Sequence, residues 1–379
     1  MKKSLLALAA LGAFAGAAQA QSSVTLYGVV DANIEYVSNM SSVTPSAANG
    51  FATGPSENLF RMSSGGLSGS RWGLRGVEDL GSGLKALFVL ESGFGLDDGR
   101  SQQGGRLFGR QAYVGLESAQ VGRVTFGRQY TSLFDMMANF SPTGYATQYE
   151  PVVAQLGLNF RSDNTAKYTG KFGPVTAVAH WSFGNGVAGG GEVPGQFRRD
   201  TGYGAGVSWS AGPFGISGAY DQYNPTLNAA GGTGEFKKAA VAASYAFGPA
   251  KLMAGYRWGM SKHVNDNTIL KDNYYWVGAN YQVTPALGLT LAYYYDDVKN
   301  FNPAAATVNT TNNIKNPWQI SFVADYNLSK RTDVYLTTAF SKNAGLNFDT
   351  SAISFANGYF LGTGEDKMIG AAIGIRHKF

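Results

Sequence analysis

The chain has 379 residues, a formal net charge of +5 and no cysteine. The lack of cysteine excludes a disulfide framework and a thiolate metal site, and so mild a positive charge gives no indication of a nucleic-acid partner. Glycine is abundant, with 51 residues, and 13% of all residues are aromatic, whereas proline is limited to 12. Disordered low-complexity chains usually lack aromatic residues, so this composition favours an ordered, β-rich protein.

The first twenty residues have the pattern of a cleavable secretory signal. Lys2 and Lys3 precede an apolar run over 5–18, and Ala-Gln-Ala follows at 18–20. The run is shorter than the roughly 20 residues of a membrane-spanning helix, and its end is rich in small residues, as at a cleavage site. Cleavage after Ala20 removes two lysines and changes the formal charge from +5 to +5 − 2 = +3.

The rest of the chain is expected to form one unit. It contains no stretch of eighteen consecutive apolar residues, so a helical inner-membrane protein is not expected. No linker-like break in composition and no cluster of like charges divides it. The predicted organisation is a signal segment at 1–20 followed by a single exported domain at 21–379.

Short turns and long polar stretches alternate along this domain, with about ten residues of alternating character between them. The short turns lie at 78–83, 117–122, 172–174, 211–215, 247–249, 283–288 and 328–332. The longer stretches, rich in Gly, Asn, Ser and Thr, lie near 38–57, 95–105, 129–158, 184–199, 222–235, 260–272, 297–315 and 342–365. Seven turns and eight loops would separate sixteen strands.

An even number of strands with strictly alternating short and long connections is typical of an outer-membrane barrel. We therefore predict an all-β fold, a sixteen-stranded antiparallel transmembrane β-barrel with short periplasmic turns and long extracellular loops. A soluble β-sandwich is the alternative, but its connections have mixed lengths and it rarely needs so long a chain.

The last strand shows the alternation of such a barrel. One face carries Ile369, Ala371, Ile373, Ile375, His377 and Phe379. The other face carries Gly370, Ala372, Gly374, Arg376 and Lys378. Because water fills the lumen and hydrocarbon lies outside, the apolar face is expected to meet lipid and the small or charged face to line the lumen.

The same alternation identifies charged residues that point into the lumen. In the second strand Trp72 and Leu74 share the outer face, so Arg71 and Arg75 are expected inside. In the third strand the apolar residues at 86, 88 and 90 face lipid. Lys85 and Glu91 are therefore expected to point inward.

The fourth strand adds one more inward arginine. Arg110 is opposite in parity to Gln111 and Tyr113, and we expect it on the lumen side together with Ala112 and Val114. In a water-filled pore the narrowest radius and the charges placed there sort the solutes. Lumen charges near the middle of the barrel are therefore candidates for ion selectivity, although they could also be merely solvated.

Several segments resemble the general porins of Gram-negative bacteria, particularly the trimeric beta-proteobacterial and neisserial porins. They are Ser23-Val-Thr-Leu-Tyr-Gly28, Ser70-Arg-Trp-Gly-Leu-Arg-Gly-Val-Glu-Asp-Leu-Gly-Ser-Gly-Leu-Lys85, Gly109-Arg-Gln-Ala-Tyr-Val-Gly-Leu116, Phe126-Gly-Arg-Gln-Tyr130 and the terminal Phe379. The resemblance extends over the whole exported domain.

The resemblance implies a trimeric outer-membrane porin whose third loop, about 129–158, folds into each barrel and narrows it. Within this loop the segment 133–139 is expected to form a short helix, although the chain lacks the Pro-Glu-Phe-Gly-Gly motif of enterobacterial porins. By the same resemblance Arg71, Arg110 and Arg161 match arginines of the pore wall. Three acids would face them, namely Glu91, Asp135 and Glu150.

The resemblance also implies the partners of the protein. They are further copies of the chain in a homotrimer, outer-membrane lipids including lipopolysaccharide, the assembly machinery that recognises a terminal strand ending in Phe379, and small hydrophilic solutes and ions. The excess of arginine at the constriction predicts a weak preference for anions. The expected function is passive diffusion through a general porin; a substrate-specific channel and a loop-mediated adhesin are the alternatives.

An enzymatic or cofactor-dependent function is not expected. The three histidines, His180, His263 and His377, are far apart, and none is paired with a serine at an informative spacing. The glycine pattern at 202–206 lies in a predicted strand that no helix follows, so it lacks the amides that bind nucleotide phosphates.

Overall fold

The computed structural model describes residues 23–184, 192–350, 353–354 and 356–379. The signal segment predicted at 1–20 lies outside the described residues, as do 185–191 of the fourth predicted loop and three residues of the last one. Within the described part of the chain, no helix is long and apolar enough to cross a membrane.

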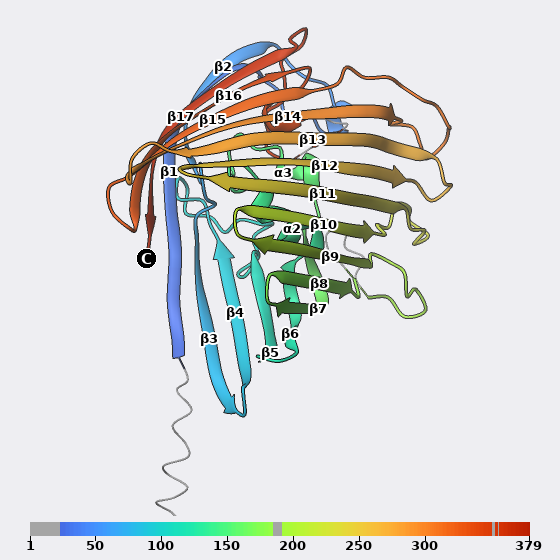
Figure 1. Ribbon diagram of the computed structural model, residues 1–379. Helices are drawn as coiled ribbons and strands as arrows, with labels where there is room; N and C mark the ends of the chain where they lie inside the picture. Colours follow the sequence, from blue (N-terminus) through green and yellow to red (C-terminus); the bar gives the residue numbers. More distant parts are fainter. Residues whose placement is uncertain (1–22, 185–191, 351–352, 355) are drawn as a thin grey trace, which may run out of the picture.

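The described residues form one antiparallel sheet of seventeen strand segments (Figure 1). Their bounds are β1 (Ser23–Ser41), β2 (Ser56–Ser64), β3 (Arg71–Gly81), β4 (Leu84–Gly93), β5 (Gln111–Ser118), β6 (Gly122–Tyr130), β7 (Arg161–Phe172), β8 (Val175–Ser182), β9 (Gly202–Ala211), β10 (Phe214–Tyr223), β11 (Glu235–Phe247), β12 (Ala250–Lys262), β13 (Thr268–Gln282), β14 (Leu287–Phe301), β15 (Trp318–Asn327), β16 (Thr332–Lys342) and β17 (Lys367–Lys378). The α-helices are α2 (Ser132–Met137) and α3 (Val152–Leu156), and the 3₁₀ helices are η1 (Ala47–Asn49), η2 (Ala138–Phe140) and η4 (Leu346–Phe348).

Two of the seventeen segments are halves of one strand. The first part of β1 pairs with β3, from Ser23 opposite Val77 onward, and its later part pairs with β2. The interruption at 65–70 is held by Asp31, whose carboxylate accepts hydrogen bonds from the backbone N–H groups of residues 66, 67 and 68. The sheet therefore has sixteen strands, as the sequence predicts.

Pairing of β17 with β1 closes the barrel. At the end of this seam Gly28 N–H donates to Phe379 O at 3.0 Å, and Phe379 N–H donates to Gly28 O at 3.1 Å. A Cβ atom on Gly28 would collide with the Phe379 ring, so the absence of a side chain at this position lets the terminal ring lie over the first strand. The terminal strand therefore closes the barrel beside the strand of Tyr27.

The barrel is apolar outside and polar inside. On β1 the outward Ile34 is 64% exposed, whereas the inward Asp31 and Glu35 are fully buried. On β17 Ile373 is 68% exposed and its neighbour Ala372 is buried. This is the arrangement expected of strands that meet lipid on one face.

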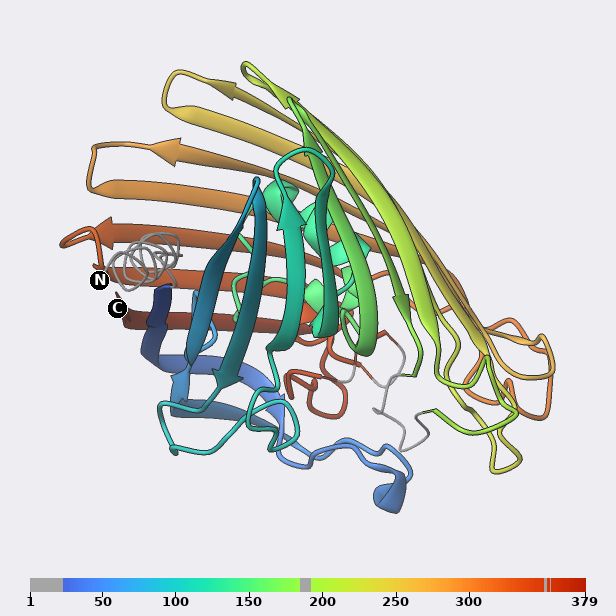
Figure 2. The same cartoon turned by 90° about the horizontal axis from the view of Figure 1, so that it is seen from below.

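The connections follow the predicted alternation of short turns and long loops. Each of the seven predicted turns joins two consecutive strands, from the turn between β3 and β4 to that between β15 and β16. The third long loop runs over 131–160, between β6 and β7. Figure 2 shows its helices inside the curve of the sheet.

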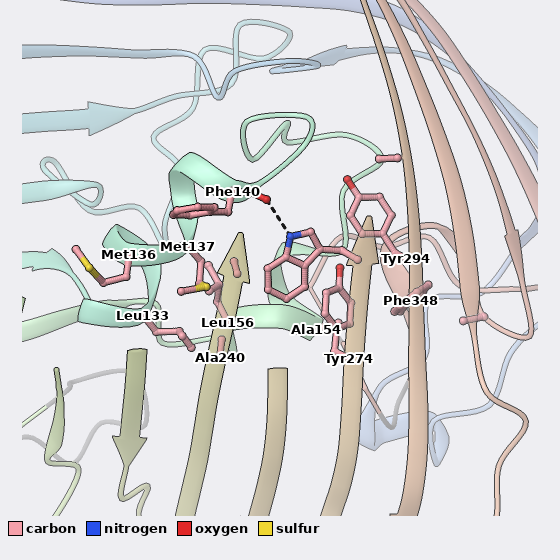
Figure 3. Packing of buried hydrophobic residues seen from close by; sticks show 14 of the residues in the cluster. Leu133, Met136, Met137, Phe140, Ala154, Leu156, Ala240, Tyr274, Tyr294 and Phe348 are labelled. Carbon is pink, nitrogen blue, oxygen red and sulfur yellow. Dashed lines mark hydrogen bonds between the residues drawn. The ribbon is translucent and has the colours of Figure 1, made fainter. Parts of the chain in front are cut away.

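The third loop has its own hydrophobic core against the inner wall of the barrel (Figure 3). Leu133, Met137 and Phe140 of the loop are buried against side chains of β11, β13 and β14. The indole Nε1 of Trp276 donates to Phe140 O at 2.9 Å, the bond that is dashed in Figure 3. Phe348, from the last loop, joins the same cluster. Two loops therefore fill part of the lumen.

Candidate pore constriction

The third loop is attached to the wall where it begins. Thr131 caps α2, since its side chain accepts a hydrogen bond from Phe134 N–H. The next two N–H groups bond to the wall, from Ser132 to His180 Nδ1 and from Leu133 to Asp221 Oδ1, both at 3.1 Å. These contacts hold the start of the loop against β8 and β10.

The middle of the loop is attached to the opposite side of the barrel. The Tyr149 hydroxyl donates to Glu35 Oε1 of β1 at 2.8 Å. The carbonyl oxygen of Tyr149 accepts a hydrogen bond from Gln319 Nε2 of β15 at 2.9 Å. Gln148 N–H donates to Gly66 O in the interruption of the second strand, at 2.9 Å. Because the loop is held on two sides, it crosses the lumen and narrows it.

A cavity of about 360 Å³ remains between the loop and the wall. Four of the predicted site residues line it, namely Arg71, Arg110, Glu150 and Arg161. The three arginines come from the wall, at or next to the loop-side ends of β3, β5 and β7, and Glu150 comes from the loop. The structure thus brings together residues that are up to 90 positions apart (71 to 161).

Glu91 is the carboxylate of the wall at this place. Its Oε1 lies 2.8 Å from Arg110 Nε, and its Oε2 lies 3.7 Å from Arg71 Nε. The Tyr27 hydroxyl donates to Oε2 at 3.1 Å. Glu91 is 5% exposed and lies between two guanidinium groups. Its negative charge is therefore neutralised by arginines of the wall.

Tyr130 joins two of the arginines. Its hydroxyl oxygen accepts hydrogen bonds from Arg110 Nη2 and Arg161 Nη2, each at 3.2 Å. The Arg161 guanidinium lies 4.9 Å from the centroid of the Tyr130 ring and 4.6 Å from that of Phe160, in cation–π contact with both. Tyr130 in turn stacks on Phe134 of the loop at 3.8 Å between centroids. The aromatic stack fixes the row of arginines.

Arg161 has a charge that no acid neutralises directly. Within the described residues no carboxylate oxygen lies within 4.0 Å of its guanidinium, and its buried Nε finds no hydrogen-bond partner there. Arg161 lines the cavity, so this uncompensated charge is suited to meet an anion there.

Glu150 lines the cavity but bonds to its own loop. Ser141 Oγ donates to its Oε1 at 2.6 Å, and the Thr143 hydroxyl donates to its Oε2. Burial raises the pKa of Glu150 to about 7, although these hydrogen bonds oppose the shift. The carboxyl group is therefore partly protonated at neutral pH.

The other predicted residues lie apart from this cavity. Asp135 forms an ion pair with Lys167 of β7 and not with an arginine; burial raises its pKa, which Lys167 partly offsets. The Arg75 guanidinium lies over the Tyr27 ring, 5.3 Å from its centroid, beside the Glu91 network. Lys85 is exposed at the turn end of β4, six residues and roughly 20 Å along the strand from Glu91.

The expectation for the face of β5 was wrong. Val114 is 58% exposed and pairs with the outward Phe126, so Ala112 and Val114 face lipid, while Gly115 is buried. Arg110 nevertheless reaches the lumen because it precedes the first residue of β5, and alternation within the strand does not determine its direction.

Two parts of the site were not predicted from the sequence: Tyr130 as a partner of the arginines, and the last loop, 343–366, as part of the lumen. Leu346 and Phe348 of this loop are fully buried, and Tyr359 donates to Glu35 Oε1 at 2.7 Å. An aromatic residue next to a lumen arginine, as in Phe160-Arg161, was the available signal for stacking; no local signal places the last loop. Among the described residues no group of three or more His, Asp or Glu side chains could hold a metal ion.

Comparisons with known proteins agree with this geometry. Residues 7–346 match the protein family described as Gram-negative porin. The chain is 32% identical to an outer membrane porin protein of Bordetella pertussis and 34% identical to outer membrane porin protein 32 of Delftia acidovorans, with both chains fully covered in each case. The major outer membrane protein P.IB of Neisseria meningitidis serogroup B is 24% identical over the same full coverage.

Solved structures agree as well. The anion-selective porin from Comamonas acidovorans matches with a TM-score of 0.72 and 28% identity, over 94% of this chain and 100% of that one. OmpT of Vibrio cholerae matches with a TM-score of 0.66 at 13% identity, over 94% and 98%, which supports the fold alone. The closed barrel and the full-length relatives place the protein in the outer membrane. The chain belongs to the family of Gram-negative porins.

Proposed function

We propose that this porin passes small hydrophilic solutes by passive diffusion with a weak preference for anions, and that the cavity between the third loop and the wall arginines is the selective part of the path. The observation that carries the proposal is the arginine row. Arg110 and Arg161 share the hydroxyl of Tyr130, and Arg161 has no carboxylate partner among the described residues.

The charges of the cavity favour anions. Three arginines line the cavity, and one wall carboxylate, Glu91, pairs with two of them. The formal net charge of these four groups is 3 − 1 = +2, without Glu150. Glu150 adds less than a full negative charge because its pKa is about 7. A positive potential in a narrow, low-dielectric passage raises the local concentration of anions. The anion-selective porin from Comamonas acidovorans, at 28% identity, supports the same sign.

We infer a homotrimer in contact with outer-membrane lipids, including lipopolysaccharide, and recognition of the terminal strand by the assembly machinery. The lipid-facing apolar side chains and the seam between Gly28 and Phe379 support this inference.

The reversal potential of single channels in a KCl gradient tests the preference. The wild-type channel should pass chloride more readily than potassium, and Arg161→Gln should lower the chloride-to-potassium permeability ratio. Arg100→Gln is the control, because Arg100 is an exposed arginine of the second long loop that does not line the cavity. A cation-preferring wild-type channel, or an unchanged ratio in Arg161→Gln, would contradict the proposal. A current that increases linearly with solute concentration separates a general porin from a channel that saturates with one solute.

A further inference from the structure

A second cavity, of about 400 Å³, lies next to α3. Val153 of α3 lines both cavities. The second cavity is bounded by the loop ends of four wall strands, at Tyr223 of β10, Phe236 of β11, Ser261 of β12 and Ile269 of β13. It therefore lies on the side of the long loops, next to the path that leads to the arginines.

Much of the lining of this second cavity is apolar, unlike the polar inner wall expected of a barrel lumen. Leu158 of the third loop is 64% exposed at the cavity, and Leu227, Phe236, Ile269 and Leu270 lie around it. Contact between water and these apolar side chains is unfavourable. A compact apolar group that displaced the water would therefore bind with a favourable free energy.

One cation stands in this apolar surface. Among the described lining residues Lys238 is the only lysine or arginine, and no carboxylate oxygen lies within 4.0 Å of its Nζ. Its side chain passes over Gly157, where the lysine Cε is 3.2 Å from the position that a Cβ would take. The Gly157 backbone has a φ of +90°, so this position favours glycine for two reasons.

The charge of Lys238 is available to a ligand. Its Nζ makes a long hydrogen bond of 3.4 Å to Ala154 O, an oxygen that also accepts from Arg257 Nη2 at 2.5 Å. Arg257 is paired with Asp272, whereas the acid of the lining, Asp221, accepts a hydrogen bond from Leu133 N–H. Arg257 and Asp221 thus have partners of their own. The buried Asp296 also acts on Lys238 electrostatically, but it forms no ion pair with it within 4.0 Å.

We propose that this second cavity binds small carboxylates that carry a compact apolar body, such as an aromatic ring, before they reach the arginines. The carboxylate pairs with Lys238, and the apolar body contacts Leu158 and Phe236. A cavity of this size with a mainly apolar lining and few polar groups is typical of small-molecule sites. The inference requires a water-filled channel but is independent of the sign of its ion preference.

Current block in planar bilayers that contain the purified full-length porin tests the site. Phenylacetate is the probe; acetate has the same head group without the ring, and phenylacetamide has the ring without the charge. Phenylacetate should reduce the open-channel current in a saturable manner, and neither of the other two should do so at the same concentration. Equal effects of phenylacetate and acetate, or of phenylacetate and phenylacetamide, would overturn the proposal.

Two substitutions locate the block. Leu158→Asn should raise the half-blocking concentration of phenylacetate about tenfold, because the apolar contact is replaced by an amide, and Lys238→Gln should raise it as well. The matched control is Leu107→Asn, at a leucine that is 63% exposed and lines neither cavity. An unchanged half-blocking concentration in Leu158→Asn, whose exposed side chain is not needed for folding, would refute the site.

The same bilayers separate this inference from the proposed ion preference. Saturable block by phenylacetate in a cation-preferring channel would support the carboxylate site and contradict the proposed anion preference. An anion-preferring channel without saturable block would support the anion preference and contradict the carboxylate site.

Discussion

Tyr149 of the third loop donates a hydrogen bond to Glu35 Oε1 at 2.8 Å. The same oxygen accepts from Tyr359 of the last loop at 2.7 Å, while Arg61 Nε holds Oε2 at 2.6 Å. Arg61 also lies over the Tyr359 ring, 5.3 Å from its centroid. One carboxylate of the first strand therefore joins two loops that are about 200 residues apart in the chain (149 and 359).

Tyr149→Phe should loosen the third loop. The buried Glu35 loses one of its donors, and a hydrogen bond to a charged group contributes about 1.5 to 3 kcal/mol. We expect a lower thermal unfolding temperature and larger fluctuations of the open-channel current. Tyr168→Phe is the control, since its hydroxyl bonds to Val121 O at an exposed turn; equal effects of the two variants would contradict a special role of Glu35.

The anion preference should decrease as the pH rises from 6 to 8. The pKa of Glu150 is raised by burial to about 7, so the group is mainly neutral below this value and carries a negative charge above it. The arginines of the cavity do not titrate in this range, and the net positive charge therefore falls with rising pH. The permeability ratio in a KCl gradient measures this change, and Glu150→Gln should abolish it.

The raised pKa also sets the sign of a stability effect. Between the ordinary pKa of a glutamate and 7, the folded state retains a proton that the unfolded chain has lost, so the contribution of Glu150 to stability declines as the pH rises through this window. Thermal unfolding of wild type and Glu150→Gln at pH 5 and pH 8 should show a smaller pH dependence in the variant. An identical pH dependence would contradict the assignment.

Deletion of Phe379 should reduce assembly while export continues. The deletion removes two main-chain hydrogen bonds to Gly28 and the ring that covers it. Less heat-modifiable protein should reach the outer membrane, as measured by electrophoresis of membrane fractions with and without boiling. Phe379→Tyr keeps the ring and the backbone and should assemble normally; normal assembly of the deletion variant would refute the role of this residue.

Arg257→Met should destabilise the barrel strongly. Arg257 is fully buried and pairs with Asp272, which is 2% exposed. Removal of one partner leaves a buried carboxylate without its cation, a change that typically costs about 3 to 5 kcal/mol. The double variant Arg257→Met/Asp272→Leu should recover part of the loss in thermal unfolding temperature, and a double variant less stable than the single one would contradict this explanation.

The sequence predicts those parts of the fold that depend on local chemistry. Turn residues such as the Gly-Pro pairs at 173–174 and 248–249 punctuate the chain where the strands end, and regular alternation places Arg71 and Glu91 inside. Alternation failed beside Arg110 because β5 begins one residue later. Prediction by parity therefore holds only within an unbroken strand.

Contacts between distant segments could not be predicted in this way. The hydrogen bond between Tyr359 and Glu35 joins residues 324 positions apart. Asp31 stabilises the interruption of the second strand by accepting hydrogen bonds from backbone amides, which have no side-chain signature. The partnership of Tyr130 with two arginines requires the loop to have folded onto the wall. None of these has a periodic or compositional signature in one sequence.

The place of the last loop limits which of its residues can be exchanged without an effect on the channel. Leu346 and Phe348 pack inside the barrel, and Tyr359 shares Glu35 with the third loop. A substitution at any of these three positions also disturbs the loop that narrows the channel. Variation of the last loop at these positions is therefore constrained by the shape of the channel as well as by the packing of the loop itself.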